Sequence, residues 1–232
     1  MPKIIFANWK KRVVTEADAV ALAQATDARG IVLLPSHELV REVAAVLWHA
    51  ELGVQDYAPD AFVTGARYAL IGHADRRAAG DTDAIVAEKL TLALVDGIVP
   101  VLCVGESRAE RDAGQAQGVL RHQVREGLSR FNNLRLPSQF IYVAYEPLWA
   151  ISTGAEREEC SPETAAHRIA YIKEQLLHLG CAASAKYLYG GSVTRKNAAQ
   201  YLNNNDIDGL LVGAASVNAE ELKNIWHLAS KS

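Results

Sequence analysis

Short, mostly apolar runs recur along the whole chain, and each is followed by a longer stretch that mixes apolar and polar residues. The runs have the length and continuous apolar character of strands that are buried on both faces of a parallel sheet. We expect eight strands, at residues 3–7, 31–34, 53–55, 68–71, 98–104, 140–144, 186–189 and 207–212.

The stretches between these runs carry the start and stop signals of helices. The clearest start is Ser161-Pro162-Glu163-Thr164, which has a capping serine, a proline in the first turn and an acidic residue behind it. Glycines such as Gly30 and Gly180 mark helix ends. We expect helices over about residues 15–29, 36–50, 81–95, 113–131, 161–179, 194–204 and 219–229.

The order of these elements predicts one closed barrel. Eight strand–helix units in 232 residues average about 29 residues each, the size of a βα repeat. Right-handed crossovers close eight such units into an α/β fold of the (β/α)8 TIM-barrel type. No linker divides the chain, so we expect a single domain over residues 1–232. An open doubly wound sheet is the alternative, but it usually has a glycine-rich first turn, and Asn8-Trp9-Lys10 is not one.

The third unit of the predicted barrel is shortened. Only the 12 residues 56–67 separate the third and fourth expected strands. That length barely covers a crossover of about 10–12 residues. Residues 60–66 could supply the tail of a helix there.

The carboxyl ends of the strands carry the candidate chemistry, since in a barrel they converge on one face. Glu146 follows the sixth strand, and Trp149 and Ile151 after it suggest a lid that closes over a base and excludes water. A strand-end glutamate that caps a helix is the alternative. Glycine turns after the seventh and eighth strands are where barrels bind phosphate. The other strand ends bring Asn8, Lys10, His73, Glu106, Gly190-Gly191-Ser192 and Gly213 to the same face.

Each of these residues also has an ordinary structural explanation. Lys10 could be a solvated lysine, and His73 could bond the backbone of a turn. Ser192 could merely cap the helix that follows it. Trp149 could be core packing, and Glu106 could cap a helix, with a supporting role in the site at most.

Composition and charge restrict the classes of partner that the protein could bind. Half of the residues, 50%, are hydrophobic, and the net charge of −3 without a basic run argues against nucleic acid. No apolar run approaches the roughly 18 residues of a membrane span, and no signal peptide is visible. The three cysteines, Cys103, Cys160 and Cys181, are scattered, which favours a reducing cytoplasm. They form no metal cluster and no HExxH pair occurs, so we expect no metal. Cys103 reads as a small core residue beneath the site.

Five segments together resemble triosephosphate isomerase. They occur in that family's order and span the chain, although no single one is decisive. The resemblance implies a barrel that interconverts dihydroxyacetone phosphate and D-glyceraldehyde 3-phosphate by proton transfer through an enediolate, with no cofactor. The segments are NWK at 8–10, IGHADRR at 71–77, AYEPLWAISTG at 144–154, YGGSV at 189–193 and GLLVGAAS at 209–216.

The resemblance also implies a role for each site residue. Glu146 would be the general base, and His73 a neutral electrophile that polarises the carbonyl. Lys10 would place a fixed positive charge beside the enediolate and the phosphate, and Asn8 would orient the substrate. Residues 148–153 would form the lid. The backbone groups that would hold the phosphate belong to Ser152, Ser192, Gly213 and Ala214.

The chain departs from the family pattern at four places. Ala74 replaces a serine whose hydroxyl is a resting partner of the base, and Asp75 replaces a glutamate but keeps the charge that pairs with the lysine. Ser152 and Ala214 replace glycines of the lid and of the phosphate turn. The short segment 56–67 lacks the loop that, in the family, reaches the neighbouring subunit and braces its asparagine and lysine. We therefore expect a monomer, or a homo-oligomer built on another face.

Two other functions remain as alternatives. One is a barrel that binds phosphate but has lost turnover through these departures. It would need neither His73 nor Glu146, whereas proton transfer needs both, together with Lys10. The other is an isomerase or lyase for a different phosphosugar, which assays with longer aldose and ketose phosphates would reveal.

Overall fold

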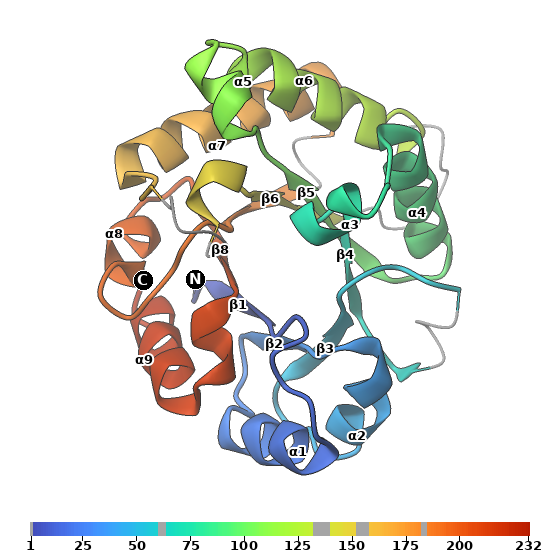
Figure 1. Cartoon of the computed structure of the whole chain (residues 1–232), viewed down its shortest axis with the longest axis vertical. Helices are drawn as coiled ribbons and strands as arrows, with labels where there is room; N and C mark the ends of the chain where they lie inside the picture. The colour runs from blue at the N-terminus through green and yellow to red at the C-terminus, as the bar shows by residue number, and fades with distance from the viewer. Residues whose placement is uncertain (1, 60–63, 132–139, 152–157, 182–184) are drawn as a thin grey trace.

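The computed structural model describes residues 2–59, 64–131, 140–151, 158–181 and 185–232. Within them, eight parallel strands pair in sequence order, and β1 also pairs with β8, so the sheet closes into a barrel. Figure 1 shows the helices arranged around this ring of strands. The predicted (β/α)8 barrel is therefore confirmed. The strands are β1 (Ile4–Asn8), β2 (Ile31–Leu34), β3 (Glu51–Val54), β4 (Tyr68–Ile71), β5 (Val99–Val104), β6 (Ile141–Tyr145), β7 (Ala185–Tyr189) and β8 (Gly209–Val212).

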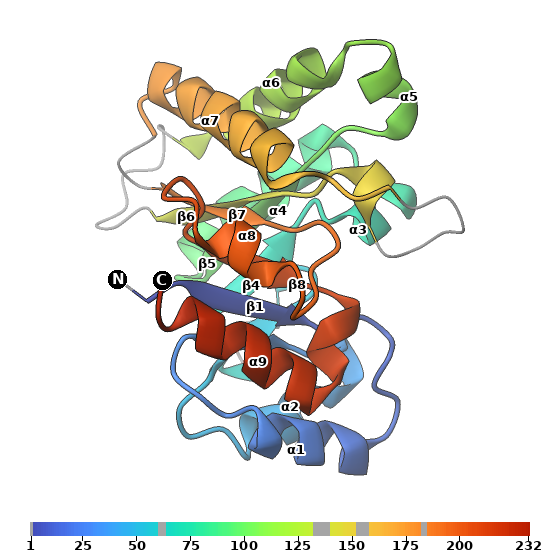
Figure 2. The same cartoon turned by 90° about the vertical axis from the view of Figure 1, so that its left-hand side faces the viewer.

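The helices cover the outside of the barrel, and Figure 2 shows them on both sides of the strands. The 3-10 helices that lie wholly in the described residues include η1 (His37–Leu39), η4 (Leu148–Ala150) and η6 (Ala214–Val217). The α-helices are α1 (Glu16–Ala25), α2 (Val40–Ala44), α3 (Ala74–Ala78), α4 (Asp83–Val95), α5 (Arg108–Asp112), α6 (Ala116–Gly127), α7 (Pro162–His178), α8 (Ala198–Leu202) and α9 (Ala219–Ala229).

Side chains along each strand alternate between the barrel interior and the layer of helices. In β1, Phe6 belongs to the inner cluster, whereas Ile5 and Ala7 belong to the outer one. The ring of Phe6 meets those of Tyr68 and Tyr142 edge-on, with centroids 5.2 and 5.1 Å apart. The interior is thus a packed core, and a site for chemistry has to lie at its mouth.

The second expected helix is much shorter than predicted. Instead of covering residues 36–50 it consists of η1 and α2 and ends at Ala44. The cause is a tertiary contact, because the carboxylate of Asp27 accepts hydrogen bonds from the backbone N–H groups of Trp48, His49 and Ala50, at 3.0, 2.8 and 2.7 Å. These groups cannot bond within a helix, and β3 begins directly afterwards, two residues earlier than expected.

Two short helices were not predicted, α3 after His73 and α5 after Glu106. The start of α5 did carry a signal, since Ser107 and Glu110 form a reciprocal capping box. Three expected helices are shorter than predicted: those at 15–29, 113–131 and 194–204 correspond to α1, α6 and α8. In the third connection, none of the described residues 55–59 and 64–67 is α-helical, and residues 60–63 of the expected helix tail lie outside the described residues.

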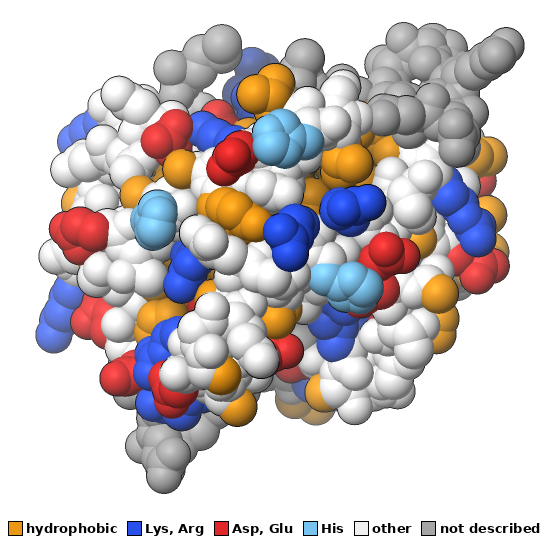
Figure 3. Space-filling model, turned by 90° about the horizontal axis from the view of Figure 1, so that it is seen from above, with side chains coloured by type: hydrophobic (Ala, Val, Ile, Leu, Met, Phe, Trp, Pro, Cys, Tyr) orange, Lys and Arg blue, Asp and Glu red, His pale blue; other side chains and the backbone are white. Residues whose placement is uncertain are grey.

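The surface mixes both signs of charge. On the face seen in Figure 3, Lys and Arg side chains are interspersed with Asp and Glu rather than gathered by sign. This distribution is in keeping with the small net charge of −3. Among the described residues, no helix combines the length and the apolar content that crossing a bilayer requires.

Candidate active site

A narrow cavity lies at the carboxyl ends of the strands. Its volume is about 20 Å³, which is room for about one water molecule. A wide groove of about 780 Å³ opens beside it and shares Asn8, Lys10, Arg12 and His73 with it. Six of the predicted site residues line the narrow cavity: Asn8, Lys10, His73, Glu146, Gly213 and Ala214.

Two residues predicted to bind phosphate stand apart from this set. Ser152 lies outside the described residues. Ser192 is buried and is not among the residues that line the narrow cavity. Its backbone N–H donates to the carbonyl oxygen of Ala150 at 3.0 Å. That N–H can bind a phosphate only after this bond breaks, so its role stays a prediction.

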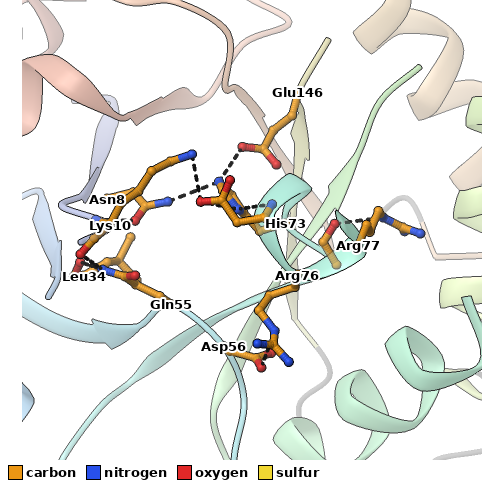
Figure 4. A network of polar contacts seen from close by, with 11 residues as sticks. Asn8, Lys10, Leu34, Gln55, Asp56, His73, Arg76, Arg77 and Glu146 are labelled. Carbon is orange, nitrogen blue, oxygen red and sulfur yellow. Dashed lines mark hydrogen bonds and ion pairs between the residues drawn. The ribbon is translucent and has the colours of Figure 1, made fainter. Parts of the chain in front are cut away.

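His73 connects the predicted base to the start of α3. Its Nδ1 accepts a hydrogen bond from the backbone N–H of Asp75 at 3.1 Å, so this nitrogen carries no proton. In the neutral ring the proton is therefore on Nε2, an assignment that follows from the hydrogen-bond network. Nε2 lies 3.2 Å from Oε1 of Glu146 and 3.3 Å from Nδ2 of Asn8. The imidazole thus presents its N–H to Glu146, and Figure 4 marks the contacts of His73 with Glu146 and Asn8 as dashed lines.

Lys10 has an unusual backbone conformation. Its φ of 53° is the only positive φ of a non-glycine residue in the described part of the chain, and such a conformation costs about 1–3 kcal/mol. Two hydrogen bonds to its backbone, and the burial of the preceding residue, hold it. Trp9 before it is fully buried, and the Lys10 N–H donates to Oδ1 of Asn8 at 3.1 Å. The side-chain amide of Gln55 donates to the carbonyl oxygens of Lys10 and Leu34, at 3.0 and 2.9 Å.

The ammonium of Lys10 pairs with Asp75, as predicted, at 3.1 Å from Nζ to Oδ2. The Lys10 side chain is 13% exposed and that of Asp75 is 57% exposed. Partial burial acts to raise the pKa of Asp75, but His73 when it is protonated, Lys10 and Arg12 outweigh it, so the pKa lies below its usual value. Asp75 therefore stays ionised and keeps the Lys10 charge compensated.

Two glycines make room for Glu146. A Cβ on Gly105 would lie 1.9 Å from the backbone oxygen of Glu146, and one on Gly190 would lie 2.9 Å from its Cγ. Either substitution would displace the carboxylate. Cys103 is a buried residue beneath the site, as expected. Burial raises the pKa of its thiol, and the nearby Glu146 carboxylate raises it further, so the thiol stays protonated.

Glu106 has a larger structural role than the sequence indicated. It is fully buried, and its Oε1 accepts hydrogen bonds from the Tyr145 hydroxyl at 2.9 Å and from Nε1 of Trp149 at 3.1 Å. Burial and then the Glu106 charge raise the pKa of Tyr145, so its hydroxyl remains a donor. Arg111 lies over the Trp149 ring, 4.2 Å from its centroid. These contacts anchor Trp149, at the start of the predicted lid segment.

An ion cluster that the sequence analysis missed holds α3 in place. Lys89 of α4 pairs with Asp56 and Asp81, at 2.8 and 2.7 Å. Arg76 of α3 pairs with the same two carboxylates, at 2.9 and 3.5 Å, and Figure 4 shows its pair with Asp56. Nothing local in the sequence indicates this cluster, because its members come from three separate segments.

Among the described residues, no group of three or more His, Cys, Asp or Glu side chains is placed to hold a metal ion. The three cysteines are buried, and none forms a disulfide in the described structure.

Comparison with known proteins adds to this geometry. Residues 3–229 match the family model described as triosephosphate isomerase. The chain is 34% identical to the triosephosphate isomerase of Azoarcus sp. over 244 residues, covering 98% of this chain and 99% of the relative. It is 35% identical to that of Acidithiobacillus ferrooxidans over 260 residues, with 100% and 98% covered. It is 36% identical to the triosephosphate isomerase of Chloroflexus aurantiacus over 250 residues, covering 97% of this chain and 98% of the relative.

Proposed function

This chain belongs to the triosephosphate isomerase family, and from that premise we propose which of its residues carry the reaction. The protein is an isomerase that interconverts dihydroxyacetone phosphate and D-glyceraldehyde 3-phosphate. The observation that supports the proposal is that Glu146, His73 and Lys10 line one cavity, with the carboxylate 3.2 Å from the imidazole. Glu146 acts as base, His73 as electrophile, and Lys10 stabilises negative charge.

The proton moves between two carbons by way of the carboxylate. Glu146 takes it from the carbon next to the carbonyl and returns it to the neighbouring carbon, while the His73 N–H polarises the carbonyl and shifts protons between the two oxygens. In the free protein this N–H faces Glu146 instead. Ala74 offers no hydroxyl, so His73 takes the place of a serine as the resting partner of the base. The substrate carbonyl then replaces Glu146 as the acceptor.

The phosphate binds at the opposite end of the substrate. Gly213 and Ala214 line the cavity at the start of η6, where the first N–H groups of a helix have no partner within the helix. Ser192 joins them once its bond to Ala150 opens, and Ser152 completes the set. A cavity of about 20 Å³ has to widen to admit a phosphotriose.

Ile151 forms part of the wall of this cavity, which supports a lid over residues 148–153. No step requires a cofactor, because the carbonyl itself acidifies the proton that is removed.

Replacing the base tests the proposal. In a coupled assay with glyceraldehyde 3-phosphate, Glu146→Gln should lower kcat by about 10³-fold or more, because the neutral amide cannot accept the proton. Glu88→Gln is the matched control, since Glu88 is an exposed residue of α4, and it should leave kcat within about twofold. Near-normal turnover by the Glu146→Gln protein would overturn the assignment. A panel of longer phosphosugars in the same assay addresses the alternative substrates.

We further propose that the chain acts as a monomer or associates by a surface other than segment 56–67. Support comes from that short segment and from the wide groove, whose rim carries the exposed cations Lys11 and Arg12. Exposed charges are depleted from the cores of subunit interfaces. A cytoplasmic location is supported by the three buried, unbridged cysteines.

A further inference from the structure

Arg12 is a cation at the edge of the site that forms no ion pair with any of the described residues. It lies between β1 and α1, two residues after Lys10, and it lines both the narrow cavity and the wide groove. Within the described part of the chain, no carboxylate forms an ion pair with it, whereas Lys10 is paired with Asp75 and Arg76 with Asp56. Arg12 is exposed, so its guanidinium is accessible to a ligand.

The charges of the cavity without Arg12 disfavour a phosphate. The Lys10 charge is compensated by Asp75, Glu146 adds a second carboxylate, and the hydrogen bonds of His73 indicate a neutral ring. The remaining groups thus carry a net negative charge. A phosphate monoester brings a further charge of about −1.5 to −2 at pH 7. A further cation would offset this repulsion, and Arg12 lines the same cavity.

We propose that Arg12 is a phosphate-binding residue of this site and acts beside the backbone N–H groups of Gly213 and Ala214, which line the same cavity. The inference rests on the proposed function, since it assigns the phosphate of that substrate to this side chain. A guanidinium presents a planar fork of donors that matches two phosphate oxygens, which makes the contact directional as well as ionic.

The test measures phosphate binding separately from turnover. Inorganic phosphate is titrated calorimetrically into wild type, Arg12→Ala, Arg12→Lys and the control Lys11→Ala. Lys11 is the adjacent exposed cation and lines only the wide groove. We expect Arg12→Ala to weaken phosphate binding about tenfold, Arg12→Lys to weaken it about threefold, and Lys11→Ala less than twofold. In the isomerase assay, the KM of Arg12→Ala should rise in the same proportion, with kcat within about twofold.

Each result decides for or against the proposal. Equal losses of phosphate affinity in Arg12→Ala and Lys11→Ala would show that only net charge matters, and would overturn the proposal. A difference that vanishes at about 0.5 M salt would indicate long-range attraction without contact, which also overturns it. Unchanged phosphate affinity in an Arg12→Ala protein with normal turnover would defeat this inference alone. Arg12-dependent phosphate binding by a chain that isomerises no phosphotriose would support it and defeat the proposed function instead.

Discussion

At the scale of single residues, the site depends on side chains that fix each other's hydrogen bonds. The Asn8 amide is oriented because its oxygen accepts the Lys10 N–H. Its nitrogen then lies 3.3 Å from Nε2 of His73, but both atoms carry hydrogen, so the Nε2 proton is left to Glu146. His73 is oriented in turn by the backbone N–H of Asp75. Gln55 holds the strained backbone of Lys10 through the Lys10 carbonyl. A chain of this kind keeps the groups within the few tenths of an ångström that proton transfer demands.

The contribution of Asp75 to stability should depend on pH. Its pKa is lowered in the folded protein, so its carboxylate stabilises the fold at pH values above its unfolded pKa of about 4. That contribution is lost as the pH falls through the lower pKa of the folded state. Asp75→Asn should reduce the free energy of unfolding at pH 7 by less than about 1 kcal/mol, because the side chain is 57% exposed and solvent screens the pair.

Urea unfolding of wild type and Asp75→Asn between pH 7 and pH 3 checks this expectation. The difference between the two proteins should stay constant above about pH 5 and shrink as the pH falls to 3. A difference that widens in acid would contradict the sign of the pKa shift.

At the scale of elements, α3 places both His73 and Asp75, yet it has only five residues. A helix this short is not stable alone, so tertiary contacts have to hold it. Arg77 of α3 donates to the carbonyl oxygen of Gly72 at 2.8 Å and pairs with Asp83 of α4 at 2.7 Å. On the other side, Arg76 joins the ion cluster around Lys89. The cluster therefore ties α3 to the short third connection and to α4.

Removing the cation of this cluster should destabilise the protein. Lys89→Met leaves Asp56 and Asp81 with one cation fewer, and the Asp81 side chain is only 7% exposed, so we expect a loss of about 2–3 kcal/mol in unfolding free energy. Lys173→Met is the matched control, because Lys173 pairs with the more exposed Asp206 and should cost about 1 kcal/mol or less. Urea denaturation measures both, and equal losses would show that the cluster is no stronger than a surface pair.

At the scale of the whole molecule, the main departure from the family pattern is the short connection in the third βα unit, residues 56–67. The connection from β3 to β4 starts with Gln55 and Asp56, both of which bond within their own chain. It leaves a wide groove of about 780 Å³ next to the narrow cavity. These bonds brace the site from within the chain, which is the arrangement that our proposal of a monomer, or of association by another face, relies on.

The mass in solution should therefore be that of one chain, 25.2 kDa. Light scattering at micromolar concentration measures it directly. The midpoint of thermal unfolding should also stay constant over a hundredfold range of protein concentration, because a dissociating oligomer would show a shift. A dimer with segment 56–67 at its interface would refute the proposal, whereas one built on another face would leave the role of the short segment intact.

Much of this protein is determined by the sequence itself. Eight apolar runs that alternate with helical stretches favour a parallel barrel, because continuous apolar runs are typical of strands buried on both faces. The barrel in turn brings the strand ends to one mouth, and Asn8, Lys10, His73 and Glu146 line one cavity there, while their roles stay predictions. The pairing of Lys10 with Asp75 was implied by the family resemblance, and the structure has the two groups 3.1 Å apart.

Only the tertiary structure decided how these groups are held and where helices stop. Asp27 ends the second helix from a different segment, and Gln55 holds Lys10 across 45 positions of chain. Arg12 reaches the cavity without any local pattern that sets it apart from Lys11. Periodicity and capping are local properties that the sequence displays, whereas long-range hydrogen bonds and ion pairs depend on which segments the closed barrel brings into contact.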